Sequence, residues 1–137
     1  MATGFQAPKR IKICGITRAD QAIAIIQAGA TALGFICVPA SPRYIDPAAI
    51  AAINTAIDRA LNRALNETTN HLHDVENRTI HSVNETSLDL PIQLETHSQI
   101  KLHINQPIQR IGVFAKAKLE TIYQTVLTAH LTGVQLH

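Results

Sequence analysis

The sequence predicts an α/β fold built around a parallel β-sheet, and three observations support this prediction. Apolar runs of strand length recur at 11–14, 32–36, 111–114 and 134–137. Stretches with apolar residues at helical spacing lie between them. Each run is therefore joined to the next by a helical crossover, which is the connection that parallel strands require. The expected order is β-α-β-α, a polar insertion, and then β-α-β.

The first strand, 11–14, is expected to stop at Gly15. Thr17 and Asp20 then resemble a capping box, in which the threonine hydroxyl accepts a backbone N–H and the carboxylate lies in the first helical turn. Gly29 is expected just beyond the end of this helix, where glycine adopts a left-handed conformation readily. The predicted apolar side of the helix consists of Ala22, Ile23, Ile25 and Ile26.

The second strand, 32–36, leads into a loop at 38–45 in which two prolines restrict the backbone. Asp46 followed by Pro47 is typical of an N-cap and a first helical position. The second helix is expected from Pro47 to about Leu65, through an alanine-rich stretch.

A polar, acidic segment, 66–108, is expected as an insertion between the second helix and the third strand of a domain that spans 1–137. From residue 66 to residue 98 it contains six acidic residues against a single arginine, Arg78. An alternation of apolar residues in its second half predicts a local hairpin, formed by Ile92, Leu94, Ile100, Leu102 and Ile104.

The third strand, 111–114, is followed by a helix predicted over 115–130. Gly133 precedes the fourth strand, 134–137. The apolar side of the third helix is expected to face the sheet, and it consists of Leu119, Ile122, Tyr123, Val126 and Leu127.

Composition narrows the function classes. Hydrophobic residues make up 46% of the chain and charged residues 16%, which predicts a packed core and excludes wholesale disorder. Five aromatic residues and no tryptophan argue against nucleic-acid binding by base stacking. No apolar run approaches the roughly 20 residues that span a bilayer, and the amino terminus lacks a signal peptide, so we expect a cytoplasmic protein without disulfides. The basic residues outside the insertion suit a small anionic substrate.

Residues that follow the strands could carry chemistry, because ligands bind at the carboxyl ends of parallel strands. Lys12 and Cys14 share one face of the first strand, and a nearby ammonium stabilises a thiolate. Ile11 and Ile13 share the opposite face and are expected to pack against helices. The alternative interpretation is that Cys14 is a small buried apolar residue and that Lys12 reaches solvent.

Two further side chains are candidates for substrate binding. Arg43, in the proline-flanked loop, could hold a carboxylate or phosphate through two hydrogen bonds, although a loop arginine is also a common surface charge. His137 could donate to a substrate or be simply exposed. Cys37 has no charged neighbour in the sequence and is expected to be a packing residue.

No metal site and no cofactor are expected. His71 and His73 could chelate weakly if the chain there were extended, but neither a cysteine nor a well-spaced second pair accompanies them. No glycine-rich phosphate loop is present. The other histidines in or near the insertion are His81, His97 and His103.

The motifs together resemble the phosphoribosylanthranilate isomerase family, whose members are (β/α)₈ TIM barrels of tryptophan biosynthesis. The resemblance rests on Lys-Ile-Cys-Gly-Ile-Thr at 12–17, Gly-Phe-Ile at 34–36, Ser-Pro-Arg-Tyr-Ile at 41–45, Gly-Val-Phe at 112–114 and Val-Gln-Leu-His at 134–137. It implies that the chain holds the first four strands and three helices of such a barrel, with an insertion.

The resemblance also implies an activity, the Amadori rearrangement of N-(5-phosphoribosyl)anthranilate to the 1-deoxyribulose phosphate. Cys14 matches the family's general base, Arg43 its substrate-binding arginine and His137 a supporting position, and no cofactor or metal is needed. The family's general acid, an aspartate after the fifth strand, and its phosphate site have no counterpart here; Asp20 and Asp46 are expected to cap helices instead.

The chain alone is therefore expected to have little activity. The competing interpretation is a non-catalytic half-barrel that serves as a binding or assembly module, or a decayed gene product. Four strands leave two open sheet edges, which predicts self-association or pairing with a complementing C-terminal half-barrel.

Overall fold

A computed structural model of the chain describes residues 10–79 and 107–137. The hairpin expected within 92–104 lies outside the described residues. The elements, in chain order, are β1 (Lys12–Cys14), α1 (Ala19–Gln27), β2 (Ala32–Ile36), α2 (Pro47–Thr79), β3 (Gln109–Phe114), α4 (Leu119–Ala129) and β4 (Gly133–Leu136).

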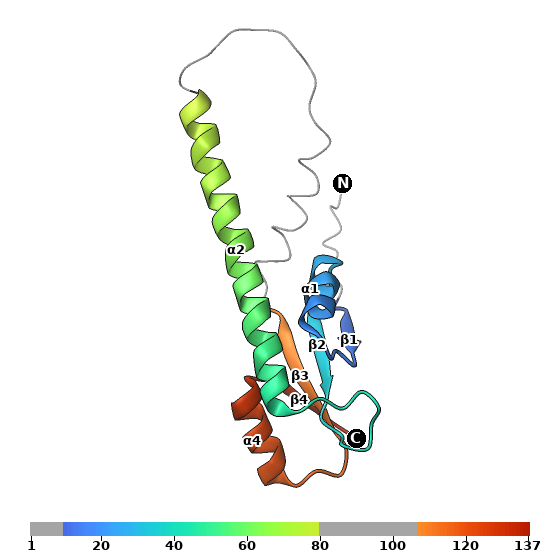
Figure 1. The fold of residues 1–137 in the computed structure, drawn as a ribbon. Helices are drawn as coiled ribbons and strands as arrows, with labels where there is room; N and C mark the ends of the chain where they lie inside the picture. Colours follow the sequence, from blue (N-terminus) through green and yellow to red (C-terminus); the bar gives the residue numbers. More distant parts are fainter. Residues whose placement is uncertain (1–9, 80–106) are drawn as a thin grey trace, which may run out of the picture.

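The four strands form one sheet in the order β1-β2-β3-β4, and every neighbouring pair is parallel. Helix α1 packs beside α2, and α2 packs beside α4, so the helices form a second layer in the same order as the strands. Figure 1 shows the three helices alongside the sheet, with α2 running well past it. The predicted α/β fold with parallel strands and helical crossovers is therefore confirmed.

The core lies between β2 and the helices. Leu33 and Phe35 of β2 are fully buried, and they belong to one apolar cluster with Ile50, Ile53 and Ile57 of α2. The isoleucines recur at intervals of three and four residues and so occupy one face of the helix. Burying a side chain of this size contributes roughly 1.5–3 kcal/mol, so this contact anchors α2 on the middle of the sheet.

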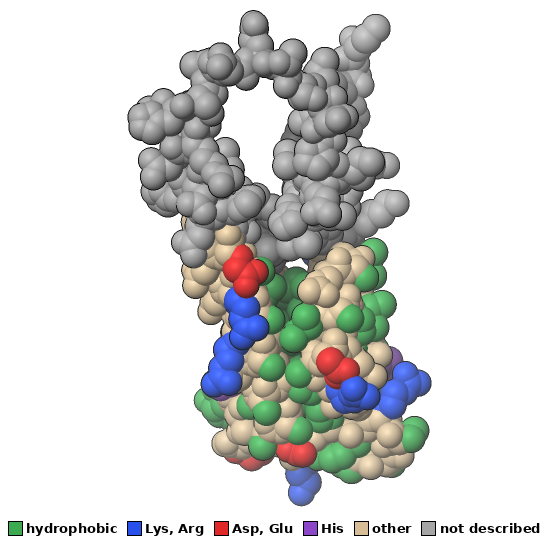
Figure 2. All heavy atoms as spheres, turned by 45° about the horizontal axis from the view of Figure 1, so that its top comes forward, with side chains coloured by type: hydrophobic (Ala, Val, Ile, Leu, Met, Phe, Trp, Pro, Cys, Tyr) green, Lys and Arg blue, Asp and Glu red, His purple; other side chains and the backbone are tan. Residues whose placement is uncertain are grey.

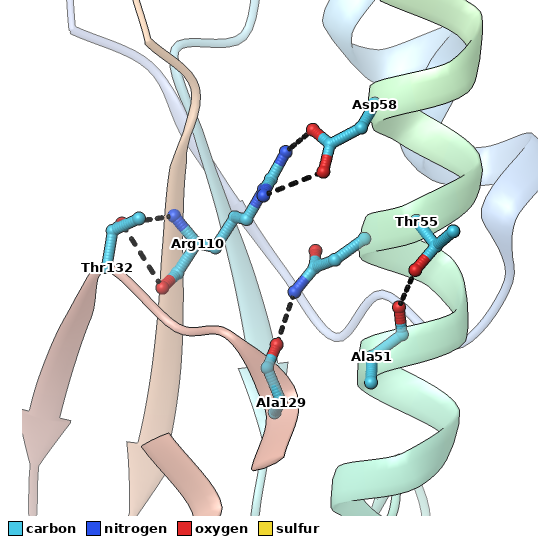
Figure 3. A network of polar contacts seen from close by, with 7 residues as sticks. Ala51, Thr55, Asp58, Arg110, Ala129 and Thr132 are labelled. Atoms are coloured by element: carbon cyan, nitrogen blue, oxygen red, sulfur yellow. Dashed lines mark hydrogen bonds and ion pairs between the residues drawn. The ribbon is translucent and has the colours of Figure 1, made fainter. Parts of the chain in front are cut away.

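Polar contacts reinforce the same junction (Figure 3). The buried Asn54 amide donates to the backbone oxygen of Ala129 at 2.7 Å, which ties α2 to the end of α4. One turn further along α2, Asp58 accepts hydrogen bonds from the guanidinium of Arg110 on β3. The backbone N–H of Arg110 donates to the Thr132 hydroxyl at 2.7 Å, just before β4. One network therefore links α2, β3, α4 and β4.

The sequence predicted the C-terminal end of α1 correctly but not its N-terminal end. Its N-cap is Arg18, with no side-chain cap, so the expected Thr17 cap is wrong. The reason is that the helix begins at Ala19, so Arg18 and not Thr17 occupies the N-cap position. Arg18 binds Asp20, with Nη2 and Oδ2 2.5 Å apart, and this contact lowers the pKa of Asp20. At the other end Gly29 has a φ of +99° and donates to the oxygen of Ile26, as predicted.

Helix α2 begins as predicted but ends later. The Asp46 carboxylate accepts the backbone N–H of Ala49 at 2.9 Å, and Pro47 is the first helical residue. The helix continues to Thr79 rather than ending near Leu65, because the stretch 66–79 contains no proline or glycine to interrupt it. The first third of the polar segment is thus a helical extension. Among the described residues no helix is long and apolar enough to cross a membrane.

Helix α4 starts later than predicted, at Leu119, and it buries only part of its predicted apolar side. Ile122 and Val126 pack on the core next to the buried Thr125 and Ala129. The remaining three residues of that side, four positions apart, follow a neighbouring stripe that is more than half exposed: Leu119 (82%), Tyr123 (56%) and Leu127 (53%).

The two edge strands also expose apolar side chains. Ile11 and Ile13 are 44% and 39% exposed, so the expectation that both pack against helices is wrong. On β4, Val134 and Leu136 are 41% and 67% exposed. The cause is the same in both places: β1 and β4 are the edges of the sheet, and each of them has a neighbouring strand on one side only. The described chain thus carries apolar surface at both edges.

We expect Asn54→Ala to lower the free energy of unfolding by about 1–3 kcal/mol, because it leaves the buried oxygen of Ala129 without its donor. The neighbouring Thr55→Ala is the control, since Thr55 is exposed and bonds only to the preceding turn of its own helix; a change within about 0.5 kcal/mol is expected. Chemical denaturation measures both, and equal losses would contradict the role given to Asn54.

Candidate functional site

The carboxyl ends of the strands bring the candidate residues to one rim. Strand β1 ends at Cys14, and β4 is followed directly by His137. Strand β2 leads into the loop that carries Arg43, and this loop returns to the sheet at Tyr44, which forms a bridge with Ile36. Because all four strands are parallel, their ends lie at the same edge of the sheet.

Cys14 is an exposed free thiol whose place depends on the absence of a side chain at Gly34. The two residues are register partners on β1 and β2. A Cβ added at Gly34 would lie 2.5 Å from the Cys14 sulfur and 3.1 Å from its Cα. The sulfur therefore occupies the space above Gly34, on the side of the sheet that Lys12 also faces. The alternative interpretation of Cys14 as a buried apolar residue is wrong.

Arg43 lies against Gly15, the residue that follows Cys14. A Cβ added at Gly15 would be 2.9 Å from both Cδ and Nη1 of Arg43, so the arginine side chain covers the residue that follows Cys14. Gly15 has a φ of +84°, which glycine adopts without strain. The Arg43 loop is fixed locally, because the Ser41 hydroxyl accepts the Arg43 backbone N–H at 3.2 Å. The structure thus brings the Arg43 side chain to the end of β1, next to the residue that follows Cys14.

Lys12 and His137 meet through a residue that the sequence analysis assigned no role. The Lys12 ammonium donates to Oε1 of Gln135, and Nε2 of Gln135 lies 2.7 Å from Nε2 of His137. Lys12 was expected to support Cys14 electrostatically, whereas its hydrogen bond goes to β4. The signal for Gln135 was its spacing, since it shares one face of β4 with position 137 in the Val-Gln-Leu-His motif.

Cys37 differs from Cys14 in its exposure to solvent. It is half-buried, packs against the apolar cluster, and its thiol lies 3.6 Å from the oxygen of Phe35. Burial raises the pKa of Cys37 to about 11, so its thiolate is scarce at neutral pH. The prediction that Cys37 is a packing residue is confirmed.

The described carboxylates that form hydrogen bonds are all engaged outside the rim cluster of Cys14 and Arg43. Asp46 caps α2 as predicted, and Asp20 binds Arg18. Asp58 pairs with Arg110, and Glu120 accepts from Gln124 within α4. Each of these four carboxylates is thus bound to a partner other than Cys14 or Arg43.

Residues 10–79 and 107–137 contain no group of three or more His, Cys, Asp or Glu that could hold a metal ion. His71 and His73, considered above as a pair for an extended chain, lie on helix α2, where positions two apart do not share a face. His81, His97 and His103 lie outside the described residues. Figure 2 shows the basic side chains of one face as separate groups among apolar ones.

Curated proteins with similar sequences share one name. The chain is 40% identical over 128 residues to an N-(5′-phosphoribosyl)anthranilate isomerase from Acaryochloris marina, and 38% identical to one from Rippkaea orientalis. Each match covers 93% of this chain but only 40% and 38% of those proteins. The resemblance inferred from the motifs is confirmed, and the chain spans about two fifths of the length of these relatives. No family model matches the chain.

Solved structures agree on the fold. A phosphoribosyl anthranilate isomerase bound to reduced 1-(o-carboxyphenylamino)-1-deoxyribulose 5-phosphate matches 93% of this chain and 42% of its own, with a TM-score of 0.55 and 26% identity. The enzyme from Thermus thermophilus matches with a TM-score of 0.53 and 27% identity. The predicted TIM-barrel type of fold is confirmed for the four strands and three helices described.

We expect Gly34→Ala to displace the Cys14 side chain and to cost about 1–3 kcal/mol of stability, because the new methyl group collides with the sulfur and with backbone. The NMR signals of the Cys14 side chain should shift. Gly133→Ala is the matched control on β4, since its Cβ would meet Ile111 at an ordinary 3.7 Å. Unchanged Cys14 signals and stability in Gly34→Ala would refute the packing described.

Proposed function

We propose that the chain provides the proton-abstracting part of an N-(5′-phosphoribosyl)anthranilate isomerase. The observation that carries this proposal is the exposed Cys14 thiol at the carboxyl rim of a parallel sheet, with the Arg43 side chain against the next residue, Gly15. The similarity to isomerases over 93% of the chain supports it. The substrate is then a small anionic phosphosugar joined to anthranilate.

Cys14 is the general base in this proposal. Protonation of the sugar ring oxygen opens the ring and leaves an iminium between C1 and the anthranilate nitrogen. The Cys14 thiolate then takes the proton from C2, and the electrons of that C–H bond form the enolamine. A proton returned to C1, together with loss of the proton of the C2 hydroxyl, gives the ketone. Two protons are thus gained and two are lost, so the isomerisation is balanced without an oxidant, a metal or a cofactor. The iminium supplies the electron sink that makes C2 acidic.

Arg43 is proposed to anchor the anthranilate carboxylate. Its guanidinium presents parallel donors that match a carboxylate in two hydrogen bonds, and the Ser41 contact reduces the freedom of the loop. His137 and Lys12 are proposed to support binding from the β4 side of the rim. With these three side chains the rim offers donors and positive charge, as an anionic substrate requires.

None of the hydrogen-bonded carboxylates within residues 10–79 and 107–137 is proposed as the general acid. Asp20, Asp46 and Asp58 are engaged elsewhere, so the 137-residue chain alone is expected to show little isomerase activity. Acid–base groups typically contribute 10²–10⁴-fold each. Like the activity, a cytoplasmic location is a prediction for this chain.

A chimera tests the base assignment. In it, this chain replaces the matching two fifths of the Acaryochloris marina relative, and turnover of N-(5′-phosphoribosyl)anthranilate is measured. We expect Cys14→Ala to lower kcat about 10²–10⁴-fold with little change in substrate binding, because it removes the proton acceptor alone. Cys37→Ala is the matched control and should retain kcat within about twofold. A small effect at Cys14 would refute its role as base.

A second function, as a binding or assembly module, is favoured by the apolar edges. We propose that further parallel strands cover β1 and β4, supplied by a complementing half-barrel in a longer protein and by a second copy when the 137-residue chain is alone. Two copies provide eight parallel strands, the number in a closed barrel of this type. The exposed stripe on α4 and the outward residues of β4 would be covered together.

The isolated chain should therefore self-associate in sedimentation velocity runs, with a size that rises with concentration. We expect the double variant Leu127→Lys, Leu136→Lys to weaken association about tenfold or more, because two exposed apolar side chains at one edge are replaced by charges. Leu65→Lys, which is 44% exposed on α2, is the control and should leave association unchanged. A compact monomer at every concentration would contradict the proposal.

A further inference from the structure

The Gln135 side chain lies between the ammonium of Lys12 and the imidazole of His137. It lies on β4, while Lys12 lies on β1, and two strands separate them in the sheet. Even so, its Oε1 accepts a hydrogen bond from the Lys12 ammonium, and its Nε2 is 2.7 Å from Nε2 of His137. The three side chains thus form one chain of contacts across the face of the sheet that bears Cys14.

The chemistry of the two neighbours leaves one arrangement of protons. A lysine ammonium has donors and no acceptor, so the amide oxygen of Gln135 must face Lys12. The amide nitrogen then faces the imidazole, and it can only donate. Nε2 of His137 must therefore accept, which means that it carries no proton. The single proton of the neutral ring is on Nδ1.

We propose that Gln135 is a positioning residue that holds the Lys12 ammonium at the rim and fixes His137 as the neutral Nδ1–H tautomer. The backbone N–H of His137 donates to Phe114 at 2.9 Å, so the position of residue 137 is also set by β3. With Nε2 occupied, Nδ1–H is the ring donor that a bound molecule can meet. Only this last step rests on the function proposed above.

The amide at position 135 determines which nitrogen of His137 carries the proton, and a carboxylate at this position would require the opposite tautomer. A glutamate would accept from Lys12 and from His137 at once, so it would require a proton on Nε2. The substitution keeps the length and shape of the side chain while it inverts the hydrogen-bond requirement at the ring. It therefore separates the proposed role from simple packing.

Nitrogen-15 NMR of the histidine rings in the 137-residue chain tests the proposal at pH 8, where ordinary imidazoles, with a pKa of about 6.5, are neutral. The wild-type chain should show His137 as the Nδ1–H tautomer. Gln135→Glu should show a proton on Nε2 of His137, and Gln135→Ala should move the ring toward the Nε2–H form. Gln109→Glu, which adds the same charge at an exposed position of β3, should leave the His137 signals unchanged.

A wild-type His137 with its proton on Nε2, or a Gln135→Glu variant that keeps the Nδ1–H form, would overturn the proposal. In the chimera described above, Gln135→Glu should also lower kcat/KM more than tenfold, mainly through KM, because it turns the ring donor away and places a negative charge beside an anionic substrate. The NMR result does not depend on turnover. Failure of the isomerase assignment and failure of the tautomer assignment are therefore distinguishable.

Discussion

The burial of β2 beneath α2 is the contact on which the rest of the structure depends. Leu33 and Phe35 have no exposed surface, and the isoleucine face of α2 closes over them. This contact fixes the position of β2 along α2. The pairing of β1 with β2 then places Cys14 opposite Gly34. The Asn54 contact carries the same constraint to the end of α4 and so to β4. The positions of the residues at the carboxyl ends of β1 and β4 therefore depend on this central packing.

The site combines groups whose placement depends on what the neighbouring positions lack. Gly34 has no side chain, so the thiol can lie above β2. Gly15 has none either, so the Arg43 side chain can lie against the end of β1. The absence of a side chain at these two glycines is therefore as necessary to the arrangement of the site as the presence of the thiol and the guanidinium. The two cysteines illustrate the result, because the same side chain is exposed at 14 and half-buried among apolar groups at 37.

The sequence predicted the strands, their parallel order and the Asp46 and Gly29 helix signals, since each depends on a few neighbouring residues. It failed where the outcome depends on partners that a linear pattern does not reveal. The exposure of Leu119, Tyr123 and the β1 isoleucines follows from the edges of the sheet, and the contact of Lys12 with Gln135 joins strands 123 residues apart. The sequence did not predict the extra length of α2, because the polar residues that continue the helix show no apolar face at helical spacing.

The length of α2 places its carboxyl-terminal end far from Cys14. At 1.5 Å per residue its 33 residues measure about 50 Å, against roughly 20 Å for β3, and the helix starts at the rim and runs past the opposite side of the sheet. Its last turns are thus remote from Cys14. A fluorophore or tether attached to the last turns of α2 would therefore lie far from Cys14, which makes this end of the helix suitable for labelling the protein.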